Sequence, residues 1–171
     1  INRNLVDLSK CTFTHCTLNS DGSITSNIQN YYYTMITTTD LNDCYMSIDP
    51  STGLFPLCLY YSVSDTNDKW VKPTVFTVTN RNNSTAIRAM ATFLIQGSQV
   101  LHPYDDLDWE TLVNVDGINL THNGANAAVN TYYVDTNKYY RHFRIKCLTV
   151  NTTSPANNNI YTVGDWNIKG Y

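Results

Sequence analysis

An all-β fold, an antiparallel β-sandwich with jelly-roll-like topology, is the fold class that this sequence predicts. Short segments of alternating apolar and polar residues recur along the 171 residues, and clusters of Asn, Asp, Gly and Ser separate them. Such a pattern is typical of a β-sandwich, and the period of a helix is almost absent. The length suits one domain, 1–171, and because the chain opens with Ile rather than Met we expect it to be part of a longer protein.

The segment Tyr139–Val150 carries the clearest strand pattern in the chain. Phe143, Ile145 and Cys147 occupy alternate positions and therefore share one face of a strand, which we expect to be buried. Arg144 lies on the opposite face, which we expect to be wet. We predict that this segment is a central antiparallel strand and that the rest of the chain supplies its partners.

The segment Thr85–Gln96 shows the same alternation. Its small residues, Ala89 and Ala91, suggest that a bulky aromatic side chain crosses over it. We expect Ile87, Ala89, Ala91, Phe93 and Ile95 on one face, and Arg88, Met90 and Thr92 on the other.

The other predicted strands lie around these two and leave one long exception. They are Asn4–Leu8, Cys11–Leu18, Ile24–Ile28, Tyr31–Ile36, Cys44–Ile48, Leu57–Val63, Val71–Thr79, Val113–Leu120, Ala127–Val134 and Ile160–Ile168. Pro73 lacks an N–H group and confines the start of its strand to a sheet edge or a bulge. The first and last strands suit pairing with each other, which favours jelly-roll topology. In Leu101–Leu112, early proline and acidic residues predict a loop with one helical turn.

Composition and charge exclude several classes of partner. Only 15% of residues are charged, against about 25% in typical domains, so Asn, Thr and Ser build a surface suited to neutral polar ligands. A net charge of −3 without any basic run argues against nucleic acid and against an anionic membrane surface. No apolar segment approaches the roughly 18 residues that span a bilayer, so we expect no membrane insertion.

The five cysteines form an odd set without the paired spacing of a zinc site. The odd count favours free, buried thiols and folding in a reducing cytoplasm, while a disulfide among the first four stays open. The residues concerned are Cys11, Cys16, Cys44, Cys58 and Cys147.

Catalytic signatures are absent from the sequence. It contains no Gly-x-Ser-x-Gly, no glycine-rich phosphate loop and no His-Glu-x-x-His, and we predict that the protein is not an enzyme. A weaker alternative is a glycan-degrading enzyme that uses Asp105, Asp106 or Asp108 as paired carboxylates.

We expect no cofactor, although a structural calcium ion stays open. Carboxylate and amide oxygens are the ligands that Ca²⁺ prefers. Besides the acidic segment that follows Pro103, the clusters Asp40–Asp43 and Asp65–Asp68 offer such oxygens.

Aromatic residues give the best functional lead. Adjacent tyrosines point to opposite faces of a strand, so one can enter the core while the other stands outside, as in Tyr31–Tyr33, Tyr60–Tyr61, Tyr132–Tyr133 and Tyr139–Tyr140. Exposed rings beside polar side chains form a platform for sugars. The predicted ligand-binding residues are Trp109 first, then Trp70 and Tyr104, with Asp105 and Asp106 beside them. Alternatively, these aromatic residues only cap the sandwich or anchor subunit contacts.

Two terminal stretches resemble a known family. Asn4-Leu-Val-Asp-Leu-Ser9 with Leu18–Asn27, and later Ile160–Lys169, are similar to the opening and closing strands of carbohydrate-binding-module-like β-sandwich domains in phage tail and other appendage proteins. Those closing strands commonly continue into Lys-Leu-Glu, whereas this chain stops at Tyr171. The central part of the chain shows no resemblance, and no binding residue is carried over.

The resemblance implies a receptor-binding domain of a virion appendage such as a tail fibre. We therefore predict a non-catalytic, lectin-like module that recognises host-surface glycan. It would contact other virion subunits as a homo-oligomer and reside in the virion after assembly in the host cytoplasm. The alternatives are a structural or decorating virion protein that binds no sugar, and an extracellular or cell-surface protein.

Overall fold

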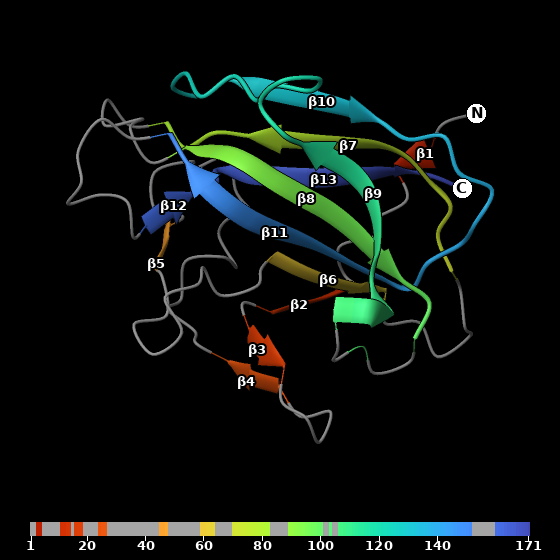
Figure 1. Cartoon of the computed structure of the whole chain (residues 1–171). Helices are drawn as coiled ribbons and strands as arrows, with labels where there is room; N and C mark the ends of the chain where they lie inside the picture. Colours follow the sequence, from red (N-terminus) through yellow and green to blue (C-terminus); the bar gives the residue numbers. More distant parts are fainter. Residues whose placement is uncertain are drawn as a thin grey trace.

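The computed structural model describes residues 3–4, 11–14, 16–18, 24–26, 45–47, 59–63, 70–82, 89–100, 103, 106–151 and 160–171. This part of the chain forms thirteen strands and one short 3₁₀ helix, Asp106–Asp108. Two antiparallel sheets stack face to face, which confirms the predicted β-sandwich (Figure 1). The predicted strand Tyr31–Ile36 and the first residues of Thr85–Gln96 lie outside the described residues.

Each main sheet has a defined strand order. One sheet runs β1 (Arg3–Asn4), β13 (Asp165–Gly170), β7 (Pro73–Thr79), β10 (Val129–Tyr133). The other runs β2 (Cys11–Thr14), β6 (Leu59–Val63), β11 (His142–Val150), β8 (Met90–Ser98), β9 (Glu110–Val115). Two smaller pairs join β5 (Tyr45–Ser47) to β12 (Ile160–Thr162), and β3 (Cys16–Leu18) to β4 (Ile24–Ser26).

The strand β11 lies at the centre of the five-stranded sheet, as its sequence predicts. It pairs with β6 on one side and with β8 on the other. Phe143 and Ile145 are fully buried, and Cys147 is buried as a free thiol, as expected. The expectation of a wet opposite face is wrong at Arg144, which has 0% exposure because the 3₁₀ helix and the residue after it cover that face.

Pairing of the first and last strands is confirmed. Arg3 pairs with Gly170 across β1 and β13, at the edge of the four-stranded sheet. The next strand of that sheet, β7, begins at Pro73, where the register with β13 shifts between Lys169 and Gly170. Pro73 therefore lies at a bulge, as predicted, although β7 itself is an inner strand.

The predicted strand Ile160–Ile168 is wrong as a single element. The structure divides it into β12, which pairs with β5, and β13, which pairs with β7. Val163 and Gly164 carry the chain between these pairings: Val163 is fully buried, and Gly164 N donates to Thr79 O at 2.8 Å. An apolar run does not reveal that its two halves have different partners.

Two further predictions needed correction. Met90, expected on the polar face of its strand, is buried in the same core cluster as Phe93, because register shifts in the pairing with β11 break the simple alternation. The predicted strand Val113–Leu120 instead begins at Glu110 and ends at Val115. Asp116 stops it there, since its Oδ1 accepts hydrogen bonds from the backbone N–H groups of Ile118 and Asn119, both at 2.8 Å.

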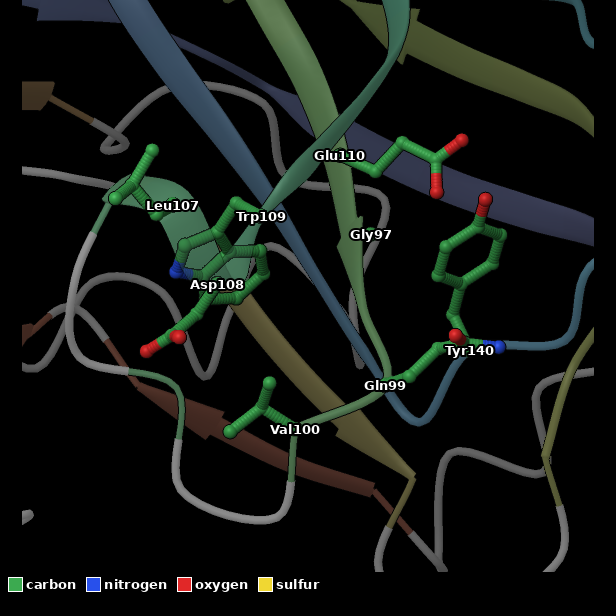
Figure 2. A pocket seen from close by; sticks show the side chains of 8 residues that line it. All are labelled: Gly97, Gln99, Val100, Leu107, Asp108, Trp109, Glu110 and Tyr140. Atoms are coloured by element: carbon green, nitrogen blue, oxygen red, sulfur yellow. The ribbon is translucent and has the colours of Figure 1, made fainter.

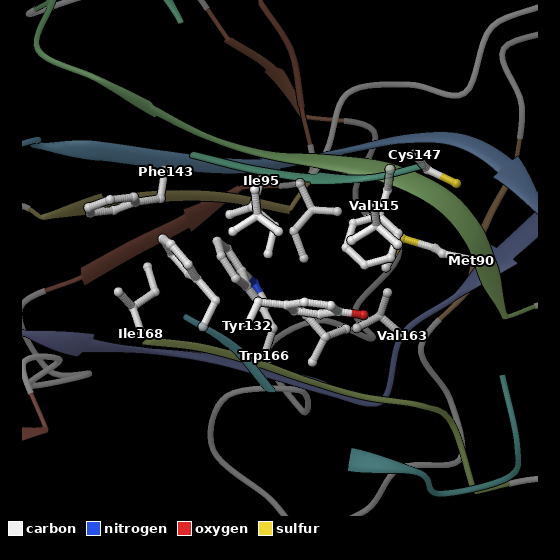
Figure 3. Packing of buried hydrophobic residues seen from close by; sticks show 14 of the residues in the cluster. Met90, Ile95, Val115, Tyr132, Phe143, Cys147, Val163, Trp166 and Ile168 are labelled. Atoms are coloured by element: carbon white, nitrogen blue, oxygen red, sulfur yellow. The ribbon is translucent and has the colours of Figure 1, made fainter. Parts of the chain in front are cut away.

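The core lies between the two sheets (Figure 3). Phe76 packs edge-on against Phe143, with ring centroids 5.8 Å apart, and stacks with Trp166 at 6.4 Å. An aromatic ring approaches β8 closely at Gly97, where a Cβ atom would lie 2.8 Å from the Tyr140 ring. The crossing expected over Ala89 and Ala91 stays a prediction. In the described part of the chain no helix is long and apolar enough to cross a membrane.

Candidate functional site

A pocket of about 210 Å³ opens where β8 ends and β9 begins (Figure 2). The connection between these strands supplies most of its wall, and Tyr140, two residues before β11, closes one side. The described residues that line it are Gly97, Gln99, Val100, Leu107, Asp108, Trp109, Glu110 and Tyr140. Three of the predicted ligand-binding residues lie at or near this pocket: Trp109, Asp106 and Trp70.

Trp109 follows the 3₁₀ helix directly and lines the pocket. Its backbone N–H donates to Asp106 O at 3.2 Å, which closes the helical turn that the sequence predicts here. The expectation of an exposed ring is wrong, because Trp109 is only 6% exposed and its ring lies 4.4 Å from the Arg144 guanidinium carbon. Contact between Trp109 and a ligand stays a prediction, and that contact would involve only part of the ring.

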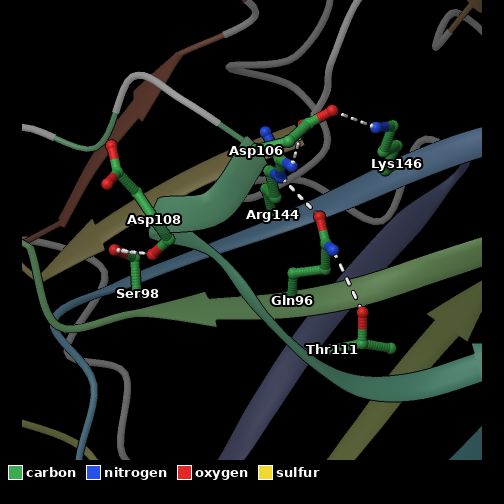
Figure 4. Close-up of polar contacts among 7 residues, drawn as sticks. All are labelled: Gln96, Ser98, Asp106, Asp108, Thr111, Arg144 and Lys146. Carbon is green, nitrogen blue, oxygen red and sulfur yellow. Dashed lines mark hydrogen bonds and ion pairs between the residues drawn. The ribbon is translucent and has the colours of Figure 1, made fainter.

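Asp106 anchors the helical turn to the central strand (Figure 4). Arg144 Nη2 donates to Asp106 Oδ1 at 2.7 Å, and Lys146 Nζ donates to Oδ2 at 2.9 Å. The hydrogen bond from Arg144, followed by that from Lys146, holds the pKa of Asp106 below its usual value. Both carboxylate oxygens are thus engaged within the protein, and Asp106 does not line the pocket.

Gln96 supplies a further polar contact of Arg144. Arg144 Nε donates to Gln96 Oε1 at 2.7 Å, and Gln96 Nε2 in turn donates to Thr111 Oγ1 at 3.1 Å. Because the side chain of Gln96 donates and accepts at once, it links the strands β11, β8 and β9 in one chain of hydrogen bonds (Figure 4).

Glu110 and Tyr140 form the opposite wall of the pocket. Lys138 Nζ donates to Glu110 Oε2 at 2.8 Å, and this bond is the main reason that the pKa of Glu110 is lowered. Tyr140 is 1% exposed, and its hydroxyl points toward the Glu110 carboxylate (Figure 2). Glu110 and Thr136 lie near enough to that hydroxyl to affect its pKa, but within the described residues it makes no well-aligned hydrogen bond. Burial raises the pKa of Tyr140, so the group is a protonated donor at neutral pH.

The remaining predicted site residues are placed as follows. Trp70 is 36% exposed beneath the Arg141 guanidinium, 6.0 Å from its carbon, and does not line the pocket. It is adjacent to Val71, which bridges to Tyr140 in backbone pairing, so it lies at the same end of the sandwich. Tyr104 and Asp105 lie outside the described residues.

No group of acidic, histidine and cysteine side chains in the described ranges could hold a metal ion. The clusters Asp40–Asp43 and Asp65–Asp68 lie beyond those ranges, so calcium there stays a prediction. The enzymatic alternative loses support at Asp106, because a carboxyl group whose pKa is lowered by two cations is a poor general acid.

The fold is similar to the β-sandwich of F5/8 type C domains and carbohydrate-binding modules of known structure. The F5/8 type C domain of a Bacteroides fragilis protein aligns with a TM-score of 0.63 and 17% identity, over 96% of this chain and 94% of that one. The carbohydrate-binding module CBM62 of Clostridium thermocellum Xyl5A aligns with 0.56 and 16%, over 94% and 93%. The family 32 module of Clostridium perfringens NanJ, in complex with galactose, aligns with 0.55 and 12%, over 99% of each chain.

These likenesses show the fold. No family model matches the chain, and no curated protein matches its sequence. The carbohydrate-binding-module part of the sequence resemblance is therefore confirmed at the level of fold, while the phage part stays a prediction.

Proposed function

We propose that the chain is a non-catalytic, glycan-binding module and that the pocket between Trp109 and Tyr140 holds the sugar. The observation that carries the proposal is the Tyr140 hydroxyl, a buried donor that faces Glu110 on the pocket wall and makes no well-aligned hydrogen bond in the described residues. Buried polar groups are almost always paired, and an unpaired one beside a cavity suits a ligand that pairs with it. Galactose in the complex of the NanJ module supports the same class of ligand.

The chemistry of the wall favours an uncharged sugar unit. A sugar hydroxyl can accept from Tyr140 and donate to the Glu110 carboxylate, and the exposed part of Trp109 offers an apolar surface for C–H groups. The described lining includes two acidic residues, Asp108 and Glu110, and no basic one. A carboxylated or sulfated sugar would meet like charge there. The volume of about 210 Å³ is below the roughly 300–1,000 Å³ of pockets for drug-sized ligands, which suits one sugar unit.

The test is calorimetric binding of matched neutral sugars and uronic acids, chosen after a glycan array. We expect the wild type to bind a neutral sugar at least about tenfold more tightly than the matching uronic acid, which corresponds to about 1.4 kcal/mol. Tyr140→Phe removes only the hydroxyl and should weaken neutral-sugar binding several-fold. Tyr133→Phe is the matched control, because Tyr133 is 81% exposed on another strand. Failure of the wild type to bind any glycan would refute the proposal.

The wider context that we propose is a homo-oligomeric virion appendage, assembled in the host cytoplasm. Its support is the similarity of Asn4–Ser9, Leu18–Asn27 and Ile160–Lys169 to phage appendage domains. Finding the protein in purified particles of an inducible phage, by mass spectrometry, would test this. A cell-surface fraction that contains the protein without any particles would contradict it.

Subunit assembly without sugar is a second candidate function, favoured by the edge strand β10. Val129 and Tyr133 are 64% and 81% exposed on its outer face, and aromatic residues are enriched in protein interfaces. The test is the mass of the protein in solution, before and after Tyr133→Asp. A monomeric wild type that binds sugar would eliminate this candidate.

A further inference from the structure

Arg144 is a buried cation in the middle of the central strand, and stability alone does not account for it. Its side chain has 0% exposure, and its Nη1 atom has no hydrogen-bond partner among the described residues. Taking a guanidinium group out of water is expensive, and a buried ion pair is often no more stable than an apolar replacement. Incomplete pairing increases that cost, which indicates that Arg144 serves the placement of the groups it contacts.

The contacts of Arg144 converge on the segment that forms the pocket wall. Its guanidinium carbon lies 4.4 Å from the centre of the Trp109 ring, and its Nη2 atom donates to Asp106. A guanidinium group combines stacking on an aromatic face with a fixed fork of donors. One side chain therefore fixes both ends of the four-residue turn 106–109.

An uncharged hydrogen bond from β8 holds the same turn in place. Ser98 Oγ donates to the backbone oxygen of Asp108 at 2.7 Å, at the end of β8 (Figure 4). Leu107, Asp108 and Trp109 all line the pocket, whereas Arg144 does not. The position of the turn thus determines the shape of the wall, and Arg144 contacts that wall from behind, at Trp109, without lining the pocket.

We infer that Arg144 is a positioning residue of the site, which acts through Asp106 and Trp109 to preform the wall of the pocket. The inference rests on the proposed function for its effect on sugar binding. Its effect on the turn is independent of any ligand, because the same contacts order residues 106–109 in the unbound protein.

Asp106 is the accessible end of this arrangement. Its side chain is 62% exposed, and it receives a second cation, Lys146, which is 25% exposed. Salt screens exposed charges more strongly than buried ones. Added salt should therefore loosen the turn and weaken the binding of an uncharged sugar, which carries no charge of its own to be screened.

The main test uses Asp106→Asn, because replacement of the buried Arg144 could unfold the protein. We expect about three- to tenfold weaker binding of a neutral sugar, together with faster amide hydrogen exchange at residues 106–110 in the ligand-free protein. Salt dependence of the affinity should be smaller in the variant than in the wild type. Asp135→Asn, at an exposed aspartate in the turn before β11, is the control and should change none of these quantities.

Arg144→Lys tests the geometry of the cation. It keeps the charge but loses the planar fork, so we expect weaker binding and faster exchange at 106–110 than in the wild type. Wild-type affinity and wild-type exchange in Asp106→Asn would overturn the inference. If the wild type binds no sugar, the proposed function fails, and the exchange measurement still decides whether Arg144 and Asp106 position the turn.

Discussion

Lowering the pH should destabilise this protein through one side chain, His122, in the loop that connects β9 to β10. Its Nδ1 atom lies 2.7 Å from the Tyr132 hydroxyl, and its Nε2 atom lies 2.6 Å from Asn80 Oδ1. Asn80 Nδ2 donates to two backbone carbonyl oxygens, which leaves its Oδ1 as the acceptor. Nε2 therefore carries the ring proton, and Nδ1 accepts from Tyr132. A second proton, on Nδ1, would break that hydrogen bond.

The magnitude follows from the pKa of this histidine. Burial lowers the pKa of His122 from 6.5 to about 4. Between these two pH values the histidine is mostly protonated in the unfolded chain and mostly neutral in the folded protein. The contribution of His122 to the free energy of unfolding is fully present above pH 6.5 and is lost as the pH falls toward 4. At about 1.4 kcal/mol per pH unit, the upper bound is about 3 kcal/mol. Because His122 is only half-buried, solvent screens part of this, and we expect about 2 kcal/mol.

The assay is urea unfolding at several pH values between 7.5 and 4.5, for the wild type and for His122→Gln. Lost hydrogen bonds should make the variant about 1–2 kcal/mol less stable at pH 7.5, and this gap should narrow as the pH falls. Carboxyl groups with a lowered pKa, such as Asp106 and Glu110, also stabilise the folded protein less as the pH falls through their lowered pKa values. Both proteins contain these groups, so their effect cancels when the two stability curves are compared. Stability curves that stay parallel over the whole range would refute the reasoning.

Three further predictions concern the core. Phe143→Ala should cost about 3–5 kcal/mol in urea unfolding, since the ring is fully buried, and a loss below about 1 kcal/mol would contradict the central position of β11. Gly97→Ala should raise the unfolding rate and lower Tm, because the new Cβ would lie 2.8 Å from the Tyr140 ring; an unchanged Tm would show that the ring can move away. Burial raises the pKa of the Cys147 thiol, so a thiol reagent should modify it only after unfolding, and rapid modification of the native protein at this residue would exclude the packing described above.

Several features could be predicted from the sequence because they depend on local geometry. Side chains in a strand alternate between its two faces, and the buried positions of Phe143 and Ile145 follow from that alternation alone. The tyrosine pairs obey the same rule, since Tyr132 is 3% exposed and Tyr133 81%, and Tyr140 is 1% exposed beside Tyr139 at 46%.

The candidate site was predicted only in part. The helical turn Asp106–Asp108 and Trp109 lie at the pocket. Glu110 and Tyr140, which carry the proposed function, were not singled out as ligand residues. The sequence marked Tyr140 as one member of an adjacent tyrosine pair, of which the exposed member was expected to bind a ligand. The buried member, Tyr140, faces the pocket instead. Whether a buried ring borders a cavity depends on residues distant in the sequence, here Gly97 and the loop that ends at Trp109.

The sequence by itself determined the class of fold and the shared buried face of Phe143, Ile145 and Cys147, because the pattern of neighbouring residues decides these. Only the tertiary structure decided that the polar face of β11 is covered at Arg144. A strand pattern assigns a charged residue to solvent, and only the return of residues 106–109 over that face supplies the carboxylate and the ring that allow its burial. The burial of a charge depends on its partners, and those partners lie about forty residues away along the chain.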